Sequence, residues 1–350
     1  MRHRATVAAA AILLLGLVAG CGRAVNQAQN ATGNAAGAAP KVNFKVGLVT
    51  DSGGLNDHGF NHLSDVGLKK AEAELGVQGS VVESKSESDY VPNLQRFAQQ
   101  GYNLVIAVGF LMDEAVKQVA PQYPNTKFLI IDDPITGINN VTSAMFKTEQ
   151  CGYLVGAMAG LMEKRTGIPG MNAQNVLGVV GGQKIPPVDS YIAGFIQGVK
   201  KTDPDGKVIV KYVNSFTDQA GGSQVAQTEI AGGADIVFQV AGGSGIGVIN
   251  AAKSAGVYAI GVDADQNYVA PNTVIVSALK GVDTATYDVI RDTLNNQFKS
   301  GVQYFDLANN GVGISKPIGV VPSDIVNQVN DLANQIKSGA ITVSDQMPQS

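Results

Sequence analysis

A loop near the start of the folded chain carries more polar side chains than a turn requires. It reads DSGGLNDHGFN from Asp51 to Asn61 and follows a short run of apolar residues typical of a buried strand. One of its side chains could cap the helix that follows, because Asp, Asn and Ser are common N-cap residues. The loop holds five such residues, namely Asp51, Ser52, Asn56, Asp57 and Asn61. This surplus predicts that the loop also binds a polar ligand.

The chain around this loop alternates between short β-branched runs and amphipathic helical runs. Short apolar runs bounded by turn residues are consistent with strands that have both faces buried. The strand-like runs are Val46–Thr50, Gly79–Glu83, Asn103–Val108, Lys127–Ile131 and Val141–Met145, then Val176–Val180, Val208–Val213, Asp235–Val240, Tyr258–Val262 and Val274–Ala278. Strand–helix alternation of this kind predicts parallel sheets covered by helices on both faces.

The two halves of the chain repeat one plan. Between matching valines, the third strand follows the first by 59 residues in the first half and by 61 in the second. The fourth strand then ends in an aspartate in both halves, Asp132 after 24 residues and Asp263 after 23. We therefore predict an α/β protein with two doubly wound parallel-sheet lobes. Ligands of such sheets bind outside the carboxyl ends of the strands, so we expect the site in the cleft between the lobes.

The first residues form a segment that is typical of a secretory signal peptide. Arg2 and Arg4 precede the apolar run Ala5–Val18, and small residues lead to Cys21. The cysteine directly after Val-Ala-Gly resembles the lipobox of bacterial lipoproteins, in which the signal is removed and the cysteine carries the lipid. A transmembrane anchor is the alternative, but residues 5–20 are fewer than the roughly 20 that a span requires. We expect Cys21 to be lipidated and to attach the protein to the extracytoplasmic face of the cell membrane.

Composition divides the chain into a leader, a linker and two lobes. Residues 22–42 are rich in Asn, Ala, Gly and Gln and lack the large apolar side chains that a core requires. As a flexible coil they would span roughly 25 Å. The expected segments are a signal peptide (1–20), a linker (21–42), a first lobe (43–148, completed by part of 276–320) and a second lobe (149–275, completed by the segment to about residue 340).

Charge and residue content argue against several classes of function. Without residues 1–20 the chain has 23 basic and 29 acidic side chains, a net charge of −6, which argues against a nucleic-acid partner. Three histidines and no tryptophan leave little material for metal or general-base chemistry. Cys151 begins an apolar helix-like run, which predicts a buried free thiol. We expect a monomer with no cofactor, no bound metal and no catalytic residue.

A series of short motifs, in order along the chain, resembles the BMP/PnrA-like (basic membrane lipoprotein) family of substrate-binding lipoproteins. The family loop D-x-G-G-x-N-D-x-S-F-N matches Asp51–Asn61, except that Gly59 replaces the serine. The further motifs are Ser86–Leu94 (S-x-S-D-Y-x-x-N-L), Val108–Phe110, Gly181–Gly182 with Ile185–Pro186, Asn214–Asp218, Ala241–Gly247, Gly261–Gln266 and Ser277–Lys280. Each motif is short, but together they span about residues 44–320 and are specific as a set.

The resemblance implies an extracytoplasmic binding protein of the type I periplasmic-binding-protein fold, with a hinge between its lobes. It also implies that the protein delivers its ligand to an ABC permease and its ATPase subunits. Characterised members bind purine or other nucleosides. Stacking on a base needs aromatic faces, and the expected candidates are Phe110 and Phe216, followed by Phe60 and Tyr90. A ligand that contacts both lobes would favour their closure.

The same resemblance assigns roles to polar residues. Asp263 matches the family's ribose-binding aspartate, and a carboxylate can accept hydrogen bonds from both hydroxyls of a ribose diol. Lys280 matches the family's lysine and would donate to a ribose oxygen or hold Asp263 ionised. In the loop Gly242–Gly247, backbone N–H groups, including that of Gly243, would approach the sugar. The candidates for reading the base edges are Asn56, Asp57 and Asp113.

Three other patterns have weaker claims to chemistry. His58 and His62, four residues apart at a helix start, could supply half of a zinc site, but the sequence offers no third strong ligand. Ser277 to Lys280 reads S-x-x-K, yet the accompanying S-D-N and K-T-G motifs are absent from the sequence. The glycines from Gly243 follow G-x-G-x-G rather than G-x-G-x-x-G. The sequence has no Walker A motif either, so ATP hydrolysis would belong to a separate subunit.

Two rival functions stay open beside nucleoside capture, for which a purine is favoured. A binding protein for a sugar or another small polar solute would need one aromatic wall and more hydrogen-bonding groups. An extracellular enzyme acting on nucleosides would need an activated base, a nucleophile or a metal, and the sequence offers no evident constellation of that kind. We expect a binding protein rather than an enzyme.

Overall fold

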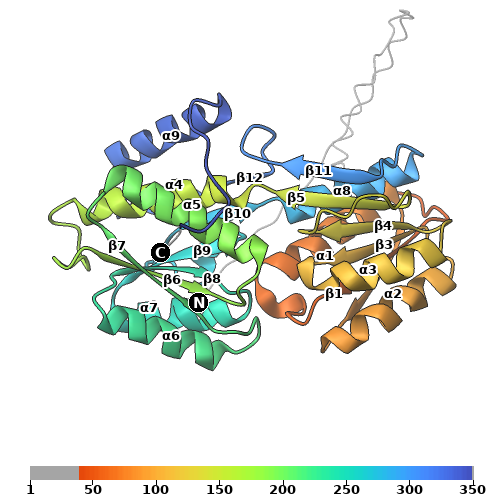
Figure 1. Ribbon diagram of the computed structural model, residues 1–350, viewed down its shortest axis with the longest axis horizontal. Helices are drawn as coiled ribbons and strands as arrows, with labels where there is room; N and C mark the ends of the chain where they lie inside the picture. The colour runs from red at the N-terminus through yellow and green to blue at the C-terminus, as the bar shows by residue number, and fades with distance from the viewer. Residues whose placement is uncertain (1–38, 349–350) are drawn as a thin grey trace, which may run out of the picture. The chain divides into compact units, whose positions relative to one another are not determined.

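Two six-stranded β-sheets form the framework of residues 39–348, the part of the chain that the computed structural model describes (Figure 1). The first sheet has the order β11-β5-β4-β3-β1-β2 and the second the order β12-β10-β9-β8-β6-β7. The strands of the first sheet are β1 (Lys45–Thr50), β2 (Gln78–Glu83), β3 (Leu104–Val108), β4 (Lys127–Ile131), β5 (Val141–Phe146) and β11 (Gly301–Phe305). Those of the second are β6 (Val176–Gly181), β7 (Lys207–Tyr212), β8 (Ile236–Val240), β9 (Tyr258–Asp263), β10 (Val274–Lys280) and β12 (Val312–Ile314).

The two sheets have the same topology. Five strands of each half occupy matching places, and every pair is parallel except β10 with β12, which is antiparallel. The prediction of two doubly wound parallel-sheet lobes is therefore confirmed. The central strands β3, β6, β8 and β9 are buried along their whole length, which explains why their sequences are apolar apart from Gln239 in β8 and Asp263 at the end of β9.

Helices pack in pairs against the sheets. In the first lobe α1 (Phe60–Leu75) packs beside α8 (Val282–Leu294), and α2 (Tyr90–Gln99) beside α3 (Asp113–Val119). Figure 1 shows α4 (Thr148–Glu163) and α5 (Pro186–Thr202) above the second sheet, with α6 (Gln219–Ala231) and α7 (Ser244–Ala255) below it. The last helix, α9 (Ser323–Lys337), packs on α4. Short 3-10 turns are η1 (Leu55–Asp57), η2 (Glu87–Asp89), η3 (Phe110–Met112), η4 (Ala120–Gln122) and η5 (Asn267–Val269).

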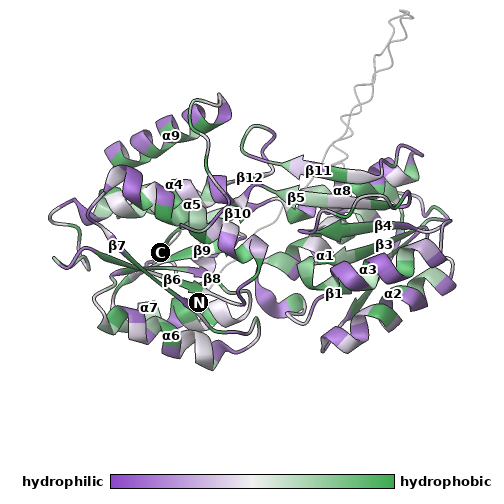
Figure 2. Cartoon of the chain, in the orientation of Figure 1, coloured by the Kyte–Doolittle hydropathy of each residue, from purple (hydrophilic) through white to green (hydrophobic). Residues whose placement is uncertain are grey.

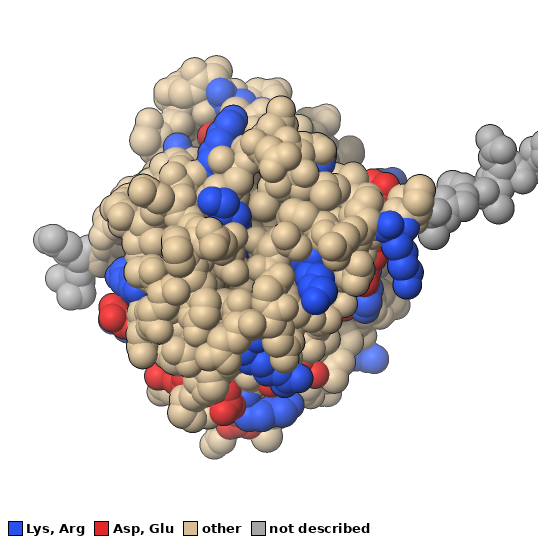
Figure 3. Space-filling model, turned by 90° about the vertical axis from the view of Figure 1, so that its right-hand side faces the viewer, with Lys and Arg blue, Asp and Glu red and all other residues tan. Residues whose placement is uncertain are grey.

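Helices α4 and α5 approach closely because glycines face the opposite backbone. A side chain on Gly156 would collide with the carbonyl oxygen of Phe195, and one on Gly198 with that of Tyr153. Figure 2 shows the usual distribution of hydropathy around this core, with apolar strands inside and polar residues on the outer helix faces. The face seen in Figure 3 carries basic and acidic side chains scattered among uncharged ones rather than one continuous patch.

Three chain segments connect the lobes and hydrogen-bond to one another. The chain crosses from β5 to α4 at Lys147, from β10 to α8 at Gly281, and from β11 to β12 over residues 306–311. The Lys147 amide donates to the Phe305 carbonyl (2.8 Å), and the Gly281 amide donates to the Gly311 carbonyl (2.9 Å). A hinge between the lobes would therefore lie at these connections. The expected lobe boundary at residue 275 falls inside β10, which pairs with the second sheet as far as Lys280.

The expected signal peptide, Cys21 and most of the linker lie outside the described residues. None of the helices between residues 39 and 348 has the length and apolar character needed to span a membrane.

A cluster of buried carboxyl groups lies at the end of the second sheet opposite to the carboxyl ends of its strands. Glu163 ends α4, Asp203 follows α5, and Asp235 precedes β8. Both oxygens of Glu163 and one oxygen of each aspartate are buried without a hydrogen-bond partner among the described residues. Burial, together with its contact with Asp235, raises the pKa of Glu163 to about 9. A proton is therefore retained in this cluster at neutral pH.

We expect Glu163→Gln to stabilise the protein at alkaline pH. The folded state holds the Glu163 proton up to about pH 9, whereas an unfolded glutamate releases it near its ordinary pKa of 4.5. The contribution of Glu163 to the free energy of unfolding is therefore fully present below about pH 4.5 and is lost as the pH rises towards 9. Urea unfolding at pH 5, 7 and 9 measures the effect, and the gap between variant and wild type should widen with pH.

The control for this prediction is Glu114→Gln, because the Glu114 side chain is 91% exposed. Its unfolding midpoint should follow the wild type at every pH. A constant difference between Glu163→Gln and the wild type from pH 5 to 9 would contradict the assignment of a retained proton.

Candidate ligand-binding site

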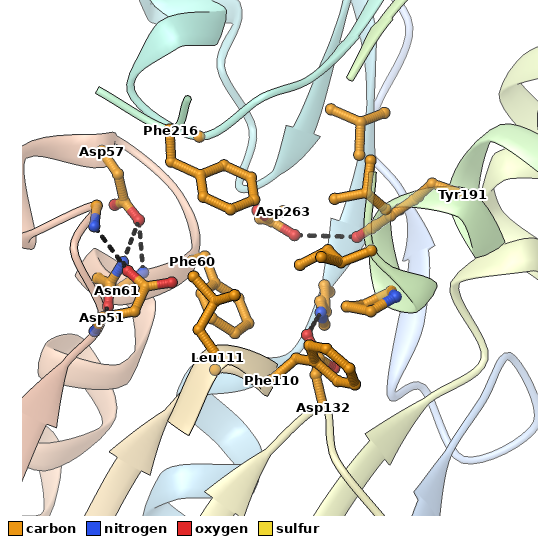
Figure 4. Close-up of a pocket in the computed structure, with 18 residues that line it drawn as sticks. Asp51, Asp57, Phe60, Asn61, Phe110, Leu111, Asp132, Tyr191, Phe216 and Asp263 are labelled. Atoms are coloured by element: carbon orange, nitrogen blue, oxygen red, sulfur yellow. Dashed lines mark hydrogen bonds and ion pairs between the residues drawn. The ribbon is translucent and has the colours of Figure 1, made fainter. Parts of the chain in front are cut away.

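The carboxyl ends of strands from both sheets meet at one cavity (Figure 4). From the first sheet it is lined by Asp51 after β1, Phe110 after β3 and Asp132 after β4. Val240 at the end of β8 and Asp263 at the end of β9 line it from the second sheet. The cavity has a volume of about 70 Å³. This small volume shows that the walls from the two lobes stand close together.

Aromatic and apolar side chains face this cavity from both lobes. Figure 4 shows Phe216 on one side with Phe60 and Leu111 across from it. Phe110, at the start of η3, lines the cavity as well. The structure thus brings together the two aromatic residues that the sequence singled out, Phe110 and Phe216. Their contact with a ligand stays a prediction.

Two glycines provide the space that the Phe216 ring occupies. A side chain on Gly182 would overlap the ring, and one on Gly242 would lie 3.5 Å from it. Gly242 has a φ of 54°, a conformation that glycine adopts without strain. The motif glycines of the second lobe therefore position an aromatic wall. Gly242 lines the cavity. The predicted residue Gly243 follows it in the chain and does not line the cavity.

Asp57 lines the cavity, but its carboxylate caps helix α1. It accepts hydrogen bonds from the backbone amides of Gly59 (3.0 Å), Asn61 (2.6 Å) and His62 (3.1 Å) and from the Asn61 side chain (3.1 Å). A carboxylate has about four acceptor positions, so these bonds use its capacity. The geometry favours Asp57 as the residue that holds the loop in place, and its predicted contact with a base edge stays untested.

The Asp51 carboxylate lines the cavity with one oxygen bonded and the other oxygen free to accept a hydrogen bond. Its Oδ1 accepts from the Gly53 amide (2.8 Å) and from Asn61 Nδ2 (2.8 Å), while Asn61 Oδ1 accepts from the Asp51 amide (3.2 Å). Oδ2 accepts no hydrogen bond from the described residues and lies close to Gly109, where an added Cβ would be 3.1 Å away. Burial, opposed by the hydrogen bonds from Asn61 and Gly53, raises the pKa of Asp51 to about 6.

The two strand-end aspartates that the repeat predicted both line the cavity, and both have the left-handed backbone conformation. Asp132 has a φ of 69° and Asp263 a φ of 62°. Tyr191 donates a hydrogen bond from its hydroxyl to Asp263 Oδ1 (3.0 Å), and Oδ2 accepts none from the described residues. Burial is the largest cause that raises the pKa of Asp263 to about 6, with the Lys280 charge acting against it. Asp263 therefore has one oxygen free for a ligand.

Lys280 bridges the lobes through Asp132. Its ammonium group, at the end of β10, pairs with the Asp132 carboxylate of the first lobe, and both side chains are buried. The rings of Phe60, Phe146 and Tyr191 lie 4.6, 5.2 and 5.9 Å from the ammonium nitrogen. Burial raises the pKa of Asp132 and the Lys280 charge opposes that rise. The partner of Lys280 is thus Asp132 rather than Asp263, to which the resemblance had connected it.

Besides Gly243, three other predicted residues, Asn56, Asp113 and Tyr90, do not line the cavity. Asn56 is exposed on η1. Asp113 pairs with Lys117 (2.6 Å) and lies beside Asp133, where burial and then the contact of the two carboxyl groups raise the pKa of Asp133 to about 7. The sequence reasoning missed Tyr191, because it lies in the middle of α5 and no strand-end signal marks it. It noted Asp132 as a strand end without assigning it a role.

The sequence also raised the questions of a metal site and of the state of the Cys151 thiol. Within residues 39–348, no three His, Cys, Asp or Glu side chains are arranged to hold a metal ion. Cys151 is a buried free thiol, as predicted, and its Sγ donates to the Thr148 carbonyl (3.2 Å). Burial raises the pKa of this thiol, which makes it unreactive.

Comparisons with known proteins agree with the sequence motifs. The family model of PnrA-like ABC transporter substrate-binding proteins matches residues 44–347. An ABC transporter nucleoside-binding protein, BmpA of Lactococcus lactis subsp. cremoris, is 32% identical and the match covers 96% of this chain and 97% of the relative. The CD4+ T-cell-stimulating antigen of Listeria innocua is 33% identical, with coverages of 86% and 88%. The predicted family resemblance is confirmed.

Solved structures show the same fold. A solute-binding protein of an ABC transporter system from Aeropyrum pernix K1 has a TM-score of 0.79 at 28% identity, covering 87% of this chain and 94% of that one. A solute-binding protein from Bacillus halodurans with bound myo-inositol has a TM-score of 0.59 at 12% identity, with coverages of 82% and 97%. The second likeness concerns the fold alone. Together with the sheet topology, these structures confirm the predicted type I fold.

We expect Lys280→Met to destabilise the protein by about 3–5 kcal/mol, the usual cost of removing one partner of a buried ion pair. The loss should be larger at pH 8 than at pH 5, because protonation at low pH neutralises the carboxyl group that is left behind. Urea unfolding at both pH values measures it. The double variant Lys280→Met/Asp132→Asn should be more stable than Lys280→Met alone. Equal stability of Lys280→Met and wild type at pH 8 would contradict the importance of this pair.

Proposed function

Because the chain belongs to the PnrA-like family of ABC transporter substrate-binding proteins, we propose that it captures a nucleoside, with a purine favoured, between its two lobes. Phe216 of the second lobe and Phe110 of the first would contact the base. Asp263 would accept hydrogen bonds from the ribose hydroxyls. Closure around the ligand would require contacts with both lobes, which this set of residues provides.

The observation that carries the proposal is the combination of aromatic walls with a free carboxylate oxygen at Asp263. The cavity is mostly apolar, which suits the faces of a flat base. Asp263 Oδ2 accepts no hydrogen bond from the described residues, while Tyr191 fixes the other oxygen. A vicinal diol supplies two adjacent donors to such a carboxylate. The name of the Lactococcus relative, a nucleoside-binding protein, supports the same ligand class.

We also infer how the protein is anchored and to which partners it passes its ligand. Cys21 would carry the lipid after removal of residues 1–20, and the lipid would hold the protein on the extracytoplasmic face of the cell membrane. The monomeric protein would pass its ligand to a permease with separate ATPase subunits, without acting as an enzyme. Uncharacterized lipoproteins of Pyrococcus and basic membrane proteins of Borrelia relatives are similar in sequence, which supports this location.

Isothermal titration of the full chain in detergent, refolded from urea to remove carried-over ligand, tests the proposal. The panel is adenosine, guanosine, inosine, cytidine, uridine, ribose and galactose. We expect one-to-one binding of a nucleoside far more tightly than ribose. Asp263→Ala should weaken that binding by about 10- to 150-fold, the usual range for a hydrogen bond to a charged group, with a nearly unchanged melting temperature.

Asp265→Ala is the matched control, because Asp265 is exposed and, within residues 39–348, its side chain accepts only from the Asn267 amide (3.1 Å). It should bind like the wild type. Heat from a sugar and none from any nucleoside would replace the proposed ligand by a sugar. Release of free base or ribose on long incubation would indicate the enzyme instead.

The affinity for a ribonucleoside should fall as the pH drops below about 6. The pKa of Asp263 is about 6 in the folded protein, so a proton competes with the ligand hydroxyls for the carboxylate below this pH. For one such group the dissociation constant rises about tenfold at pH 5 relative to pH 7.5. Titrations at the two pH values measure it, and Asp263→Asn should show a flatter profile. Equal affinity of the wild type at both pH values would rule out an ionised Asp263 as the acceptor.

A further inference from the structure

A further contact between the lobes lies outside the cavity and involves the backbone and the ring of His58. This residue belongs to the loop of the first lobe, and its Nδ1 shares a hydrogen bond with the Tyr268 hydroxyl of the second lobe (2.7 Å). Both side chains are exposed, Tyr268 by 59%. Which of the two atoms donates depends on the tautomer of the imidazole. This contact uses a histidine that the sequence had connected with a half zinc site.

A second bond joins the same residue to a rigid part of the second lobe. The His58 carbonyl accepts from Gln266 Nε2 (3.2 Å). Gln266 is buried, and its Oε1 accepts from Gln239 Nε2 (2.6 Å) and from the Val262 amide (3.0 Å). The backbone amide of Gln266 donates to Ser277 Oγ (3.1 Å). Gln266 therefore presents its amide group to His58 from a fixed position.

The backbone of His58 is shaped for this contact. Its φ of 56° lies in the left-handed region, which costs a residue with a side chain some conformational energy. The turn brings the following Gly59 against the second lobe, where an added Cβ would lie 3.3 Å from Asp263 Oδ2. A serine at this position, as in the family loop, would press on that oxygen. The His58 contacts and the free oxygen of Asp263 are thus held together by one turn.

We propose that His58, Tyr268 and Gln266 form a latch that holds the lobes closed over the bound ligand. The inference rests on the proposed function and adds positioning residues to it. All three lie outside the cavity lining, so they act on closure and not by touching the ligand. A single hydrogen bond at an exposed site contributes little free energy, so the latch favours the closed lobes modestly, with and without ligand, and slows the escape of a bound ligand.

Tyr268→Phe in the full chain tests the latch, because it removes one hydroxyl group and leaves the ring. Dissociation of the nucleoside identified by the titration panel should become about 2- to 10-fold faster, as the loss of one hydrogen bond predicts, with the association rate unchanged. Stopped-flow displacement measures both rates. Hydrogen–deuterium exchange of the ligand-free protein gives a second readout, and segments 55–62 and 264–270 should exchange faster in the variant.

Tyr304→Phe is the matched control, because Tyr304 is 58% exposed and its hydroxyl makes no hydrogen bond to the described residues. It should leave dissociation and exchange unchanged. His58→Gly removes the ring and keeps the carbonyl, and glycine accepts the positive φ without strain. It should act in the same direction as Tyr268→Phe, and the double variant should add little to either single change.

Exchange and dissociation equal to the wild type in Tyr268→Phe would overturn the latch. If no nucleoside binds to any variant, the proposed function fails, and the exchange of the ligand-free protein still decides about the latch. Faster exchange in Tyr268→Phe and His58→Gly, with Tyr304→Phe unchanged, would then support the contact between the lobes independently of the ligand.

Discussion

The buried ion pair of Lys280 with Asp132 is the interaction on which the arrangement of the cavity depends. Four aspartates line this cavity, and Lys280 is the one cation among the residues that line it. The Lys280 ammonium group pairs with the Asp132 carboxylate. Asp263 and Asp51 are therefore left without a cationic partner in direct contact. Burial then raises the pKa of both carboxyl groups to about 6, and donors from a ligand become the natural compensation. The same pair also joins the lobes beside the crossover at Gly281.

The repeated plan of the two lobes explains why one aspartate can pair with Lys280 while its counterpart keeps a free oxygen. Equivalent strands β4 and β9 lead to equivalent aspartates with the same left-handed conformation, so the fold presents two carboxylates to one cleft. Strand β10 supplies Lys280 only in the second lobe, where the matching strand of the first lobe is β5. One aspartate is therefore paired across the cleft and the other is bound by Tyr191. A nearly symmetric framework gives an asymmetric site, as recognition of an asymmetric ligand requires.

The sequence predicted the framework well because its signals are local. Apolar runs marked the central strands, and the spacing of the two halves revealed the repeat. The site was harder to predict because its contacts join residues far apart in the chain. Asp57 has the residue type of a ligand contact, but three backbone amides use its oxygens. Tyr191 and the pairing of Lys280 with Asp132 depend on how a helix and two sheets meet, which no spacing in the sequence encodes.

The first loop links these features, because its residues serve the fold and the cleft together. Asp57 caps α1 and so places Phe60, at the first position of that helix, beside the Lys280 ammonium. The turn at His58 then directs its carbonyl to Gln266 and brings Gly59 against Asp263. A change of conformation in this loop would therefore move an aromatic wall and the surroundings of the free carboxylate in one step. The excess of polar residues that marks this loop in the sequence thus has a physical cause, since most of them hold the loop in the shape that the cleft needs.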